Sequence, residues 1–246
     1  MFNFFISPEQ LNGGVAEIQG KDYNHIKNVL RMEKGEKFLV SVSGVSHLCS
    51  LKDFTIDAVI CEIIEENYLD TALPINIHLF QGLPKSDKLE LIIQKAVELG
   101  VTEITPVEMA RSIVKLEPKK KKDKTERWQA IAESSAKQSK RTIIPTVHEP
   151  ITFKNALSVA KNTDLIILPF ECANGMDALK SVLAEIKQGM TVSVFIGPEG
   201  GFDESEVKTA IESGARLVSL GKRILRTETA SILTVGALML YTEMNL

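Results

Sequence analysis

The sequence has few cysteines, a single tryptophan and no long apolar run. Its three cysteines show no Cys-x-x-Cys spacing, which argues against a disulfide framework or a thiolate zinc site and indicates a reducing compartment. The longest nearly apolar segment, residues 232–241, is interrupted by Thr234 and Gly236 and is far shorter than the ~18 residues of a membrane-spanning helix. The first residues lack the basic region and cleavage site of a signal peptide. We therefore expect a cytoplasmic protein with no membrane partner.

Several ligand-binding patterns are also missing. The four histidines are scattered along the chain, as are Cys49, Cys61 and Cys172, and we expect no metal. Because no Gly-x-Gly-x-x-Gly occurs, dinucleotide binding is weakly supported. The absence of Gly-x-x-x-x-Gly-Lys-[Ser/Thr] excludes the ordinary nucleoside triphosphate loop.

The charge of the protein is unevenly distributed. The net charge is −3, yet residues 111–142 hold 11 Lys or Arg and 4 Asp or Glu, a local charge of +7 that leaves −10 for the remainder. A lysine run such as 119–122 is by itself typical of a solvated loop. Followed by a predicted basic helix at 124–140, it favours contact with nucleic-acid phosphates. The residues that we expect to bind RNA are Arg111, Lys119, Lys120, Lys121, Lys122, Lys137 and Arg141.

The hydrophobic pattern changes near residue 72, which predicts two domains, 1–71 and 72–246. Short alternating strands are predicted in the first at 2–6, 15–18, 37–42, 47–51 and 58–64. With one helix at 22–32, they indicate a small β-barrel. The acidic stretch 65–70 and Pro74 mark its end.

The second domain has the alternating strands and helices of an α/β protein. Strands are predicted at 75–80, 104–107, 146–147, 165–168, 191–196 and 217–220. A helix capped by Ser86 or Asp87 is predicted through Leu99. Further helices are predicted at 124–140, 153–161, 176–187 and 230–244, and after Asp203. Gly100 stands where a helix-ending glycine is expected.

Three polar loops follow predicted strands of this domain, at 168–174, 197–202 and 220–229. In an open α/β sheet, ligands bind in the crevice outside the carboxyl ends of the strands. In the second loop, Gly200 and Gly201 let backbone amides approach a ligand, although a tight turn explains two glycines equally well. Asp203 and Glu206 form a capping box for the next helix.

The third loop carries more chemistry. Helix capping by Thr227 or Thr229 would account for its threonines. It does not account for Arg226 beside Glu228, and we therefore regard the crevice as a candidate active site.

Two motifs in these loops resemble a known family. Phe-Ile-Gly-Pro-Glu-Gly-Gly-Phe at 195–202 and Leu-Gly-Lys-Arg-Ile-Leu-Arg-Thr-Glu-Thr-Ala at 220–230 are similar to the signature of the bacterial small-subunit (16S) ribosomal RNA uridine-N3 methyltransferases, of the SPOUT superfamily. Leu-Pro-Lys at 83–85 and the helix at 94–101 match too, so the resemblance covers essentially the whole chain. Lys222, Ile224 and the segment 170–172 depart mildly from the pattern, which leaves the role of Glu171 open.

This resemblance implies a fold and a reaction. The second domain would be a SPOUT α/β-knot domain with a trefoil knot, and the first a PUA-like β-barrel that binds RNA. The family uses S-adenosylmethionine and works as a homodimer on ribosomal RNA or the small ribosomal subunit. Matching by position, the cofactor would be bound by Leu168, Gly197, Gly200, Leu220, Gly221, Leu225 and Thr227.

The same resemblance suggests catalytic residues. Uracil N3 must lose its proton before it can accept a methyl group, and a cationic donor would stabilise the resulting anion. Arg226 is our candidate, with a structural ion pair to Glu199 or Glu228 as its alternative role. Whether Glu199, Glu228 or water takes the proton stays open.

Two other functions remain possible from the sequence alone. One is a SPOUT methyltransferase with a different RNA acceptor, such as a ribose 2′-hydroxyl or a transfer-RNA base. The other is a non-catalytic RNA-binding or ribosome-assembly protein, which would need only the barrel and the basic segment.

Overall fold

The computed structural model describes residues 1–171 and 175–246. Cys172 and the end of the first predicted loop lie outside the described residues. The chain divides into two compact units. The first comprises Met1–Ala72 and Ala136–Ile144, and the second comprises Leu73–Ser135 and Pro145–Leu246.

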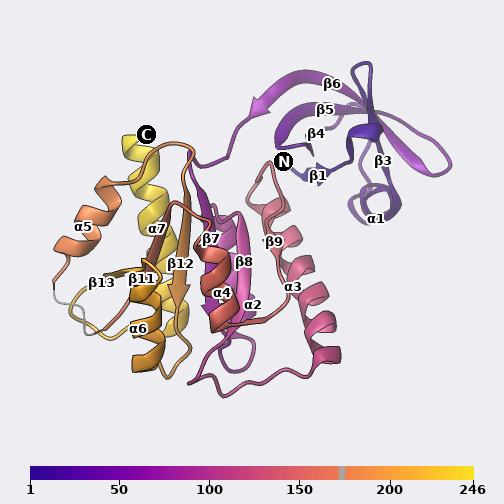
Figure 1. Cartoon of the computed structure of the whole chain (residues 1–246). Coiled ribbons are helices and arrows are strands. Elements are labelled where there is room, and N and C mark those ends of the chain that lie inside the picture. The colour runs from indigo at the N-terminus through magenta and orange to yellow at the C-terminus, as the bar shows by residue number, and fades with distance from the viewer. Residues whose placement is uncertain (172–174) are drawn as a thin grey trace. The chain divides into compact units, whose positions relative to one another are not determined.

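A six-stranded mixed sheet forms the first unit (Figure 1). Its order is β1 (Asn3–Phe5), β4 (Lys37–Val42), β5 (Val45–Phe54), β6 (Ala58–Leu69), β3 (Val15–Gln19) and β2 (Leu11–Asn12). Successive residues of a strand point to opposite faces, and the inward set, including Phe4, Ile18, Phe38 and Leu51, forms one core. A short 3-10 helix, η1 (Pro8–Gln10), precedes β2.

Two segments of this unit differ from the prediction. The helix expected at 22–32 is an α-helix, α1 (Gly20–Asn24), that continues as a π-helix, η2 (His25–Leu30), and ends where Arg31 has a φ of 52°. The acidic stretch 65–70 was expected to follow the last strand, but β6 continues through it to Leu69. The reason is that β5 offers backbone partners, with Leu48 paired to Glu65. The acidic side chains can then remain in solvent.

The segment 136–144 joins the first unit through long-range contacts that the sequence did not indicate. Lys137 Nζ lies 2.9 Å from Asp22 Oδ1. Asn3 Nδ2 donates to the Arg141 carbonyl at 2.9 Å, and the Thr142 amide donates to Thr71 Oγ1. These bonds join the segment 136–144 to Asp22, to Asn3 of β1 and to Thr71, all within the first unit.

The second unit contains a seven-stranded parallel sheet. Its order is β10 (Ile151–Thr152), β8 (Glu103–Glu108), β7 (Asn76–Gly82), β12 (Thr191–Ile196), β11 (Leu165–Pro169) and β13 (Arg216–Val218), and β9 (Thr146–Val147) also pairs with β8. β12 lies between β7 and β11, so the loops after these strands meet at the carboxyl edge near the middle of the sheet.

Helices cover both faces of this sheet. α4 (Phe153–Ala160) and α6 (Glu204–Glu212) share a core with Phe80, Phe195 and Leu168. α2 (Lys88–Glu98) and α7 (Thr227–Asn245) pack on each other, and α7 contacts β7 and β12. α5 (Asp177–Ala184) packs near β13.

Several helix boundaries were predicted correctly. α2 is preceded by Asp87 and ends before Gly100, which has a φ of +101°. At α6 the capping box is confirmed, because the Asp203 side chain accepts from the Glu206 amide and the Glu206 side chain accepts from the Asp203 amide.

Two other helices begin earlier than predicted. α3 (Pro118–Gln138) includes the lysine run, which was expected to precede the helix. A proline is tolerated in a first helical turn because its missing amide has no partner there. α7 begins at Thr227 rather than at residue 230. Arg226 is its N-cap residue, so the expectation that Thr227 or Thr229 caps this helix was wrong.

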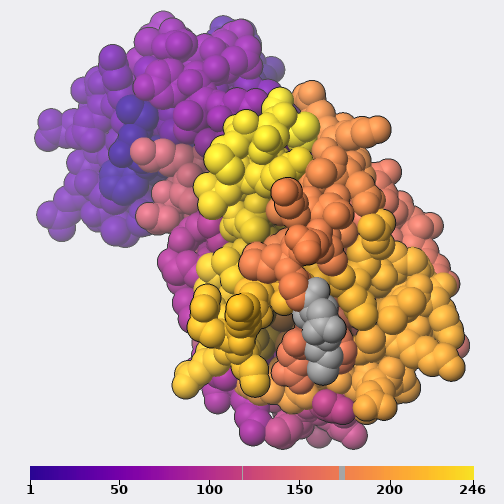
Figure 2. Space-filling model, turned by 90° about the vertical axis from the view of Figure 1, so that its left-hand side faces the viewer, coloured from indigo at the N-terminus to yellow at the C-terminus, as the bar shows by residue number. Residues whose placement is uncertain are grey.

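One side of α7 is open to solvent (yellow in Figure 2). Leu233, Leu240 and Met244 are 44%, 54% and 72% exposed, and their spacing of seven and four residues places them on one face of the helix. No helix among the described residues is long and apolar enough to cross a membrane.

Candidate active site

A pocket of about 510 Å³ opens at the carboxyl edge of the second unit's sheet. The loops after β11, β12 and β13, the start of α7 and one lysine of α2 form its wall. The described lining consists of Lys88, residues 169–171, 196–202, 219–221 and 223–227, and Ala230. The crevice predicted from the strand-end loops is therefore a pocket in the structure.

Glycines shape the wall of this pocket. A Cβ on Gly197 would lie 3.2 Å from Gly201 Cα, and one on Gly200 would lie 3.0 Å from Arg111 Cβ. Both distances are tighter than ordinary carbon contacts, so side chains here would push the loop apart. Gly221 has a φ of +106°, a conformation that side chains rarely adopt. The two loops therefore need glycine at these positions, for lack of space at Gly197 and Gly200 and for backbone conformation at Gly221.

A buried hydrogen-bond network fixes the loop after β12 to the start of α7. Thr227 Oγ1 donates to the Gly197 carbonyl at 2.6 Å and accepts from Gln81 Nε2 at 2.9 Å. Ser231 Oγ donates to Gln81 Oε1. Gln81 and Ser231 have no exposed surface, and Thr227 is only 5% exposed. β7, β12 and α7 are therefore joined where the pocket begins.

Lys88 stands between two carboxylates at the pocket. Its Nζ lies 2.9 Å from Glu199 Oε1 and 3.6 Å from Glu228 Oε2. Glu199 also accepts from the Lys85 amide at 3.1 Å, which ties the loop after β12 to the loop after β7. One lysine thus holds both acidic residues that the sequence had selected.

These contacts determine the charge states of Glu199 and Lys88. Burial alone would raise the pKa of Glu199, but the hydrogen bonds from Lys88 and the Lys85 amide outweigh burial and hold that pKa below its ordinary value. The same bond to Glu199 raises the pKa of Lys88 above its ordinary value. Glu199 is therefore a carboxylate near neutral pH, and a weak base.

Arg226 borders the pocket with an exposed side chain. The sequence left open whether it would instead form an ion pair with Glu199 or Glu228. Within the described parts of the chain, neither carboxylate pairs with Arg226, because both lie against Lys88. The ion pair that a structural role for Arg226 would need is therefore absent from the described residues.

The residues expected to bind the cofactor lie close together, with one difference. Six of the seven border the pocket: Gly197, Gly200, Leu220, Gly221, Leu225 and Thr227. The seventh, Leu168, has no exposed surface and packs in the core with Phe195. The lining begins with the next residue, Pro169. Of the three expected catalytic residues, Arg226 and Glu199 border the pocket, and Glu228 lies next to Lys88.

The residues expected to bind RNA are dispersed. Arg111 donates to the Gly200 carbonyl at 3.2 Å and lies 3.7 Å from Asp203, so it supports the loop after β12. Lys121 pairs with Glu108 at 2.7 Å, and the exposed Lys120 lies 3.5 Å from Glu117.

Two further members of that set are held within the first unit. Lys137 is paired with Asp22, and Arg141 is only 3% exposed, with a pKa lowered by burial to about 10. Lys119 and Lys122 are also exposed on α3.

Sequence reasoning did not identify Lys88, Gln81 or Ser231. Lys88 follows the Leu-Pro-Lys segment at the start of α2, and this position in a matching motif was the one available signal. Gln81 and Ser231 gave none, because they are 150 residues apart and meet only in the folded chain.

Comparison with known families gives two matches. A family described as RNA methyltransferase domain matches residues 71–239, and one described as RNA methyltransferase PUA domain matches residues 18–66. The first match contains every residue of the pocket wall.

Comparison with individual proteins agrees. The ribosomal RNA small subunit methyltransferase E of Bacillus subtilis is 37% identical over 231 residues, 92% of this chain and 90% of its own. That of Mesomycoplasma hyopneumoniae is 36% identical, over 94% and 96% of the two chains. The crystal structure of the Neisseria gonorrhoeae enzyme of the same name, bound to S-adenosyl methionine, is 33% identical and superimposes with a TM-score of 0.82, covering 98% and 97% of the two chains.

Proposed function

Because this chain belongs to the ribosomal RNA small subunit methyltransferase E family, we propose that it transfers a methyl group from S-adenosylmethionine to ribosomal RNA of the small subunit. The observation that carries the proposal is the pocket at the carboxyl edge of the parallel sheet, with backbone exposed by glycines and Arg226 at its border. A protein that only binds RNA has no need of such a pocket.

The pocket suits S-adenosylmethionine. Its volume of about 510 Å³ lies within the range of small-molecule sites, ~300–1,000 Å³. Gly200 and Gly221 line the pocket without side chains that would keep a ligand from the backbone, and Leu220 and Leu225 would offer it apolar contact. When bound, the cofactor supplies an electrophilic methyl group on a sulfonium. Thr227 would act by fixing Gly197.

For the acceptor we propose N3 of a uridine, as the resemblance implies. Once N3 loses its proton, the uracil ring is an anion, and a preorganised cation beside it lowers the barrier. Arg226 is placed for this role, because it borders the pocket and has no carboxylate partner among the described residues. Arg223 borders the same pocket on the same loop and provides a matched control.

Glu199 and Glu228 take a supporting role in this proposal. Both are engaged by Lys88, and the lowered pKa of Glu199 makes it a poor proton acceptor near neutral pH. We assign them to holding Lys88 and the loop after β7, and assign proton removal to water.

The substrate must also be held and unstacked, since a base in a helix cannot enter the pocket. The PUA-like unit and the exposed lysines of α3, Lys119 and Lys122, would hold the surrounding phosphates. We further propose a cytoplasmic homodimer. The apolar face of α7 formed by Leu233, Leu240 and Met244 supports a dimer contact.

Another RNA acceptor is the alternative, because the sequence motifs themselves say little about the acceptor atom. Mass spectrometry of ribosomal RNA from a strain lacking the protein tests the proposal directly. We expect one N3-methyluridine to disappear from the small-subunit RNA and to return on complementation. An unchanged small-subunit modification map would contradict the proposed function, and loss of a different methylated nucleotide would contradict only the acceptor.

A further inference from the structure

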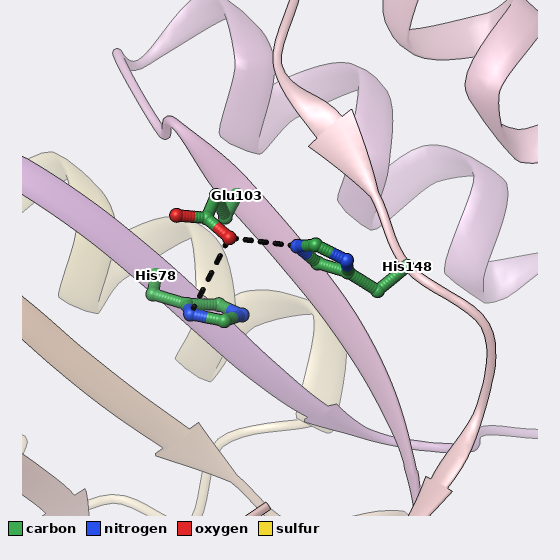
Figure 3. Close-up of side chains that lie close together, drawn as sticks. All are labelled: His78, Glu103 and His148. Atoms are coloured by element: carbon green, nitrogen blue, oxygen red, sulfur yellow. Dashed lines mark hydrogen bonds and ion pairs between the residues drawn. The ribbon is translucent and has the colours of Figure 1, made fainter. Parts of the chain in front are cut away.

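A second cluster of reactive side chains lies in the same unit, outside the pocket (Figure 3). It consists of His78 on β7, Glu103 at the start of β8 and His148 just after β9. His78 is paired in register with Glu103, and Glu103 with Thr146 on the other side. Since His148 is two residues beyond Thr146, all three side chains point to one face of the sheet. None of them borders the pocket.

The three side chains present their ligand atoms to a common point. Glu103 Oε2 lies 2.7 Å from His148 Nε2 and 3.9 Å from His78 Nδ1, and the three atoms all lie within 4.8 Å of one another. Two zinc bonds of 2.0–2.1 Å at the tetrahedral angle hold their ligand atoms about 3.3 Å apart. The separations of 2.7 and 3.9 Å therefore each differ from that value by about 0.6 Å.

The surroundings fix His78 in the orientation that such a ligand needs. Its Nε2 is hydrogen-bonded to Thr105 Oγ1 at 2.7 Å, which leaves Nδ1 directed at Glu103. An outer hydrogen bond of this kind selects the tautomer and the ring orientation of metal-binding histidines. The ring also stacks on Phe80 with centroids 4.0 Å apart.

The cluster is accessible on its other side. His78 is 5% exposed, whereas the side chains of His148 and Glu103 are 41% and 44% exposed. An ion can enter from solvent and keep water as a fourth ligand. Two histidines and one carboxylate with an open position are a set that binds zinc in proteins.

We propose that His78 Nδ1, Glu103 Oε2 and His148 Nε2 bind one zinc(II) ion, which joins β7, β8 and the segment after β9. The consequence is structural. β9 has only two residues, and an ion at His148 would fasten the chain that follows α3 to the parallel sheet. The spacing of the histidines in the sequence did not indicate this zinc site, because only the order of the strands brings His78 and His148 together.

The test uses the full-length protein after dialysis against a chelator. Titration with zinc chloride, followed by calorimetry, should give one site per chain. In His148→Ala the affinity should fall by more than the ~10–100-fold that loss of an outer-shell partner costs. His25→Ala, which removes an exposed histidine of the first unit, should bind zinc as the unchanged protein does. His148 is partly exposed, so its removal leaves the core intact, and circular dichroism checks this.

Two further measurements separate a true site from casual binding. Cobalt(II) should give the visible absorption of a four-coordinate nitrogen and oxygen site in the unchanged protein and in His25→Ala, but not in His148→Ala. Zinc should raise the thermal unfolding temperature of the unchanged protein and of His25→Ala, and leave that of His148→Ala unchanged. An absence of zinc binding, or binding that His148→Ala and His25→Ala affect equally, would overturn the proposal. The methylation assay does not enter this test.

Discussion

Replacing Thr227 by valine should loosen the pocket by removing one hydroxyl from its buried network. The substitution keeps the shape of the side chain and its position at the start of α7. It removes the 2.6 Å bond to the Gly197 carbonyl and the acceptor for Gln81 Nε2. Gln81 is fully buried, so the amide hydrogen that pointed at Thr227 has no water to replace the lost oxygen.

The expected cost follows from these two bonds. A typical hydrogen bond contributes about 0.5–1.5 kcal/mol net, and a buried donor left without a partner costs about 1–3 kcal/mol. The free energy of unfolding should therefore fall by about 1.5–4.5 kcal/mol. Thr234→Val provides a matched control, because Thr234 is buried on the same helix and its hydroxyl donates only to the Ala230 carbonyl one turn earlier. We expect a loss of less than about 1 kcal/mol there.

Urea unfolding followed by tryptophan fluorescence measures the difference. Trp128 is the only tryptophan, is 4% exposed and belongs to the second unit, so its emission reports on the unit that holds the pocket. Thr227→Ser, which keeps the hydroxyl, should restore most of the loss. If Thr227→Val and Thr234→Val lowered the free energy of unfolding equally, the network would not be what fixes the loop after β12.

Three further results are expected. Arg226→Ala should abolish methyl transfer and leave cofactor affinity within several-fold, whereas the control Arg223→Ala should retain methyl transfer. If Arg226→Ala lowered methyl transfer and cofactor affinity equally, Arg226 would be structural. Lys119→Ser with Lys122→Ser should weaken RNA binding and reduce the slope of log affinity against log salt by about 1.5, and an unchanged slope would remove these lysines from the interface. Lys88→Met should raise the pKa of Glu199, because burial is then no longer opposed by the hydrogen bond from Lys88. A carboxyl NMR titration would detect the change. The stability that the Lys88–Glu199 bond contributes is present above the ordinary carboxyl pKa and is lost as pH falls through the lowered pKa of Glu199. The free energies of unfolding of the unchanged protein and of Lys88→Met should therefore converge in acid.

Local signals in the sequence predicted most of the fold. The strand at 191–196, the helix-ending Gly100 and the capping box at Asp203 each depend on neighbouring residues alone. Two of the wrong or incomplete predictions involve partners distant in sequence. β6 runs through its acidic end because β5 pairs with it, and the segment 136–144 joins the first unit through Asp22 and Asn3.

The same distinction applies to the active site. Motifs identified the loops, because their glycines and Arg226 are typical of a ligand-binding site. The motifs did not indicate that Glu199 and Glu228 pair with Lys88. Whether Arg226 pairs with Glu199 or Glu228 depended on a third residue, Lys88, more than 130 positions away.

Lys88 also gives a physical reason for the charge of the pocket. Two carboxylates close to an arginine would ordinarily neutralise it and compete with an anionic substrate. Here Glu199 and Glu228 share Lys88, at 2.9 and 3.6 Å, and the lowered pKa of Glu199 keeps this group charged and occupied near neutral pH. Within the described residues, the charge of Arg226 is thus left for a ligand. An arginine in that state would favour the uracil anion over neutral uracil, which is the difference that the proposed methyl transfer to N3 requires.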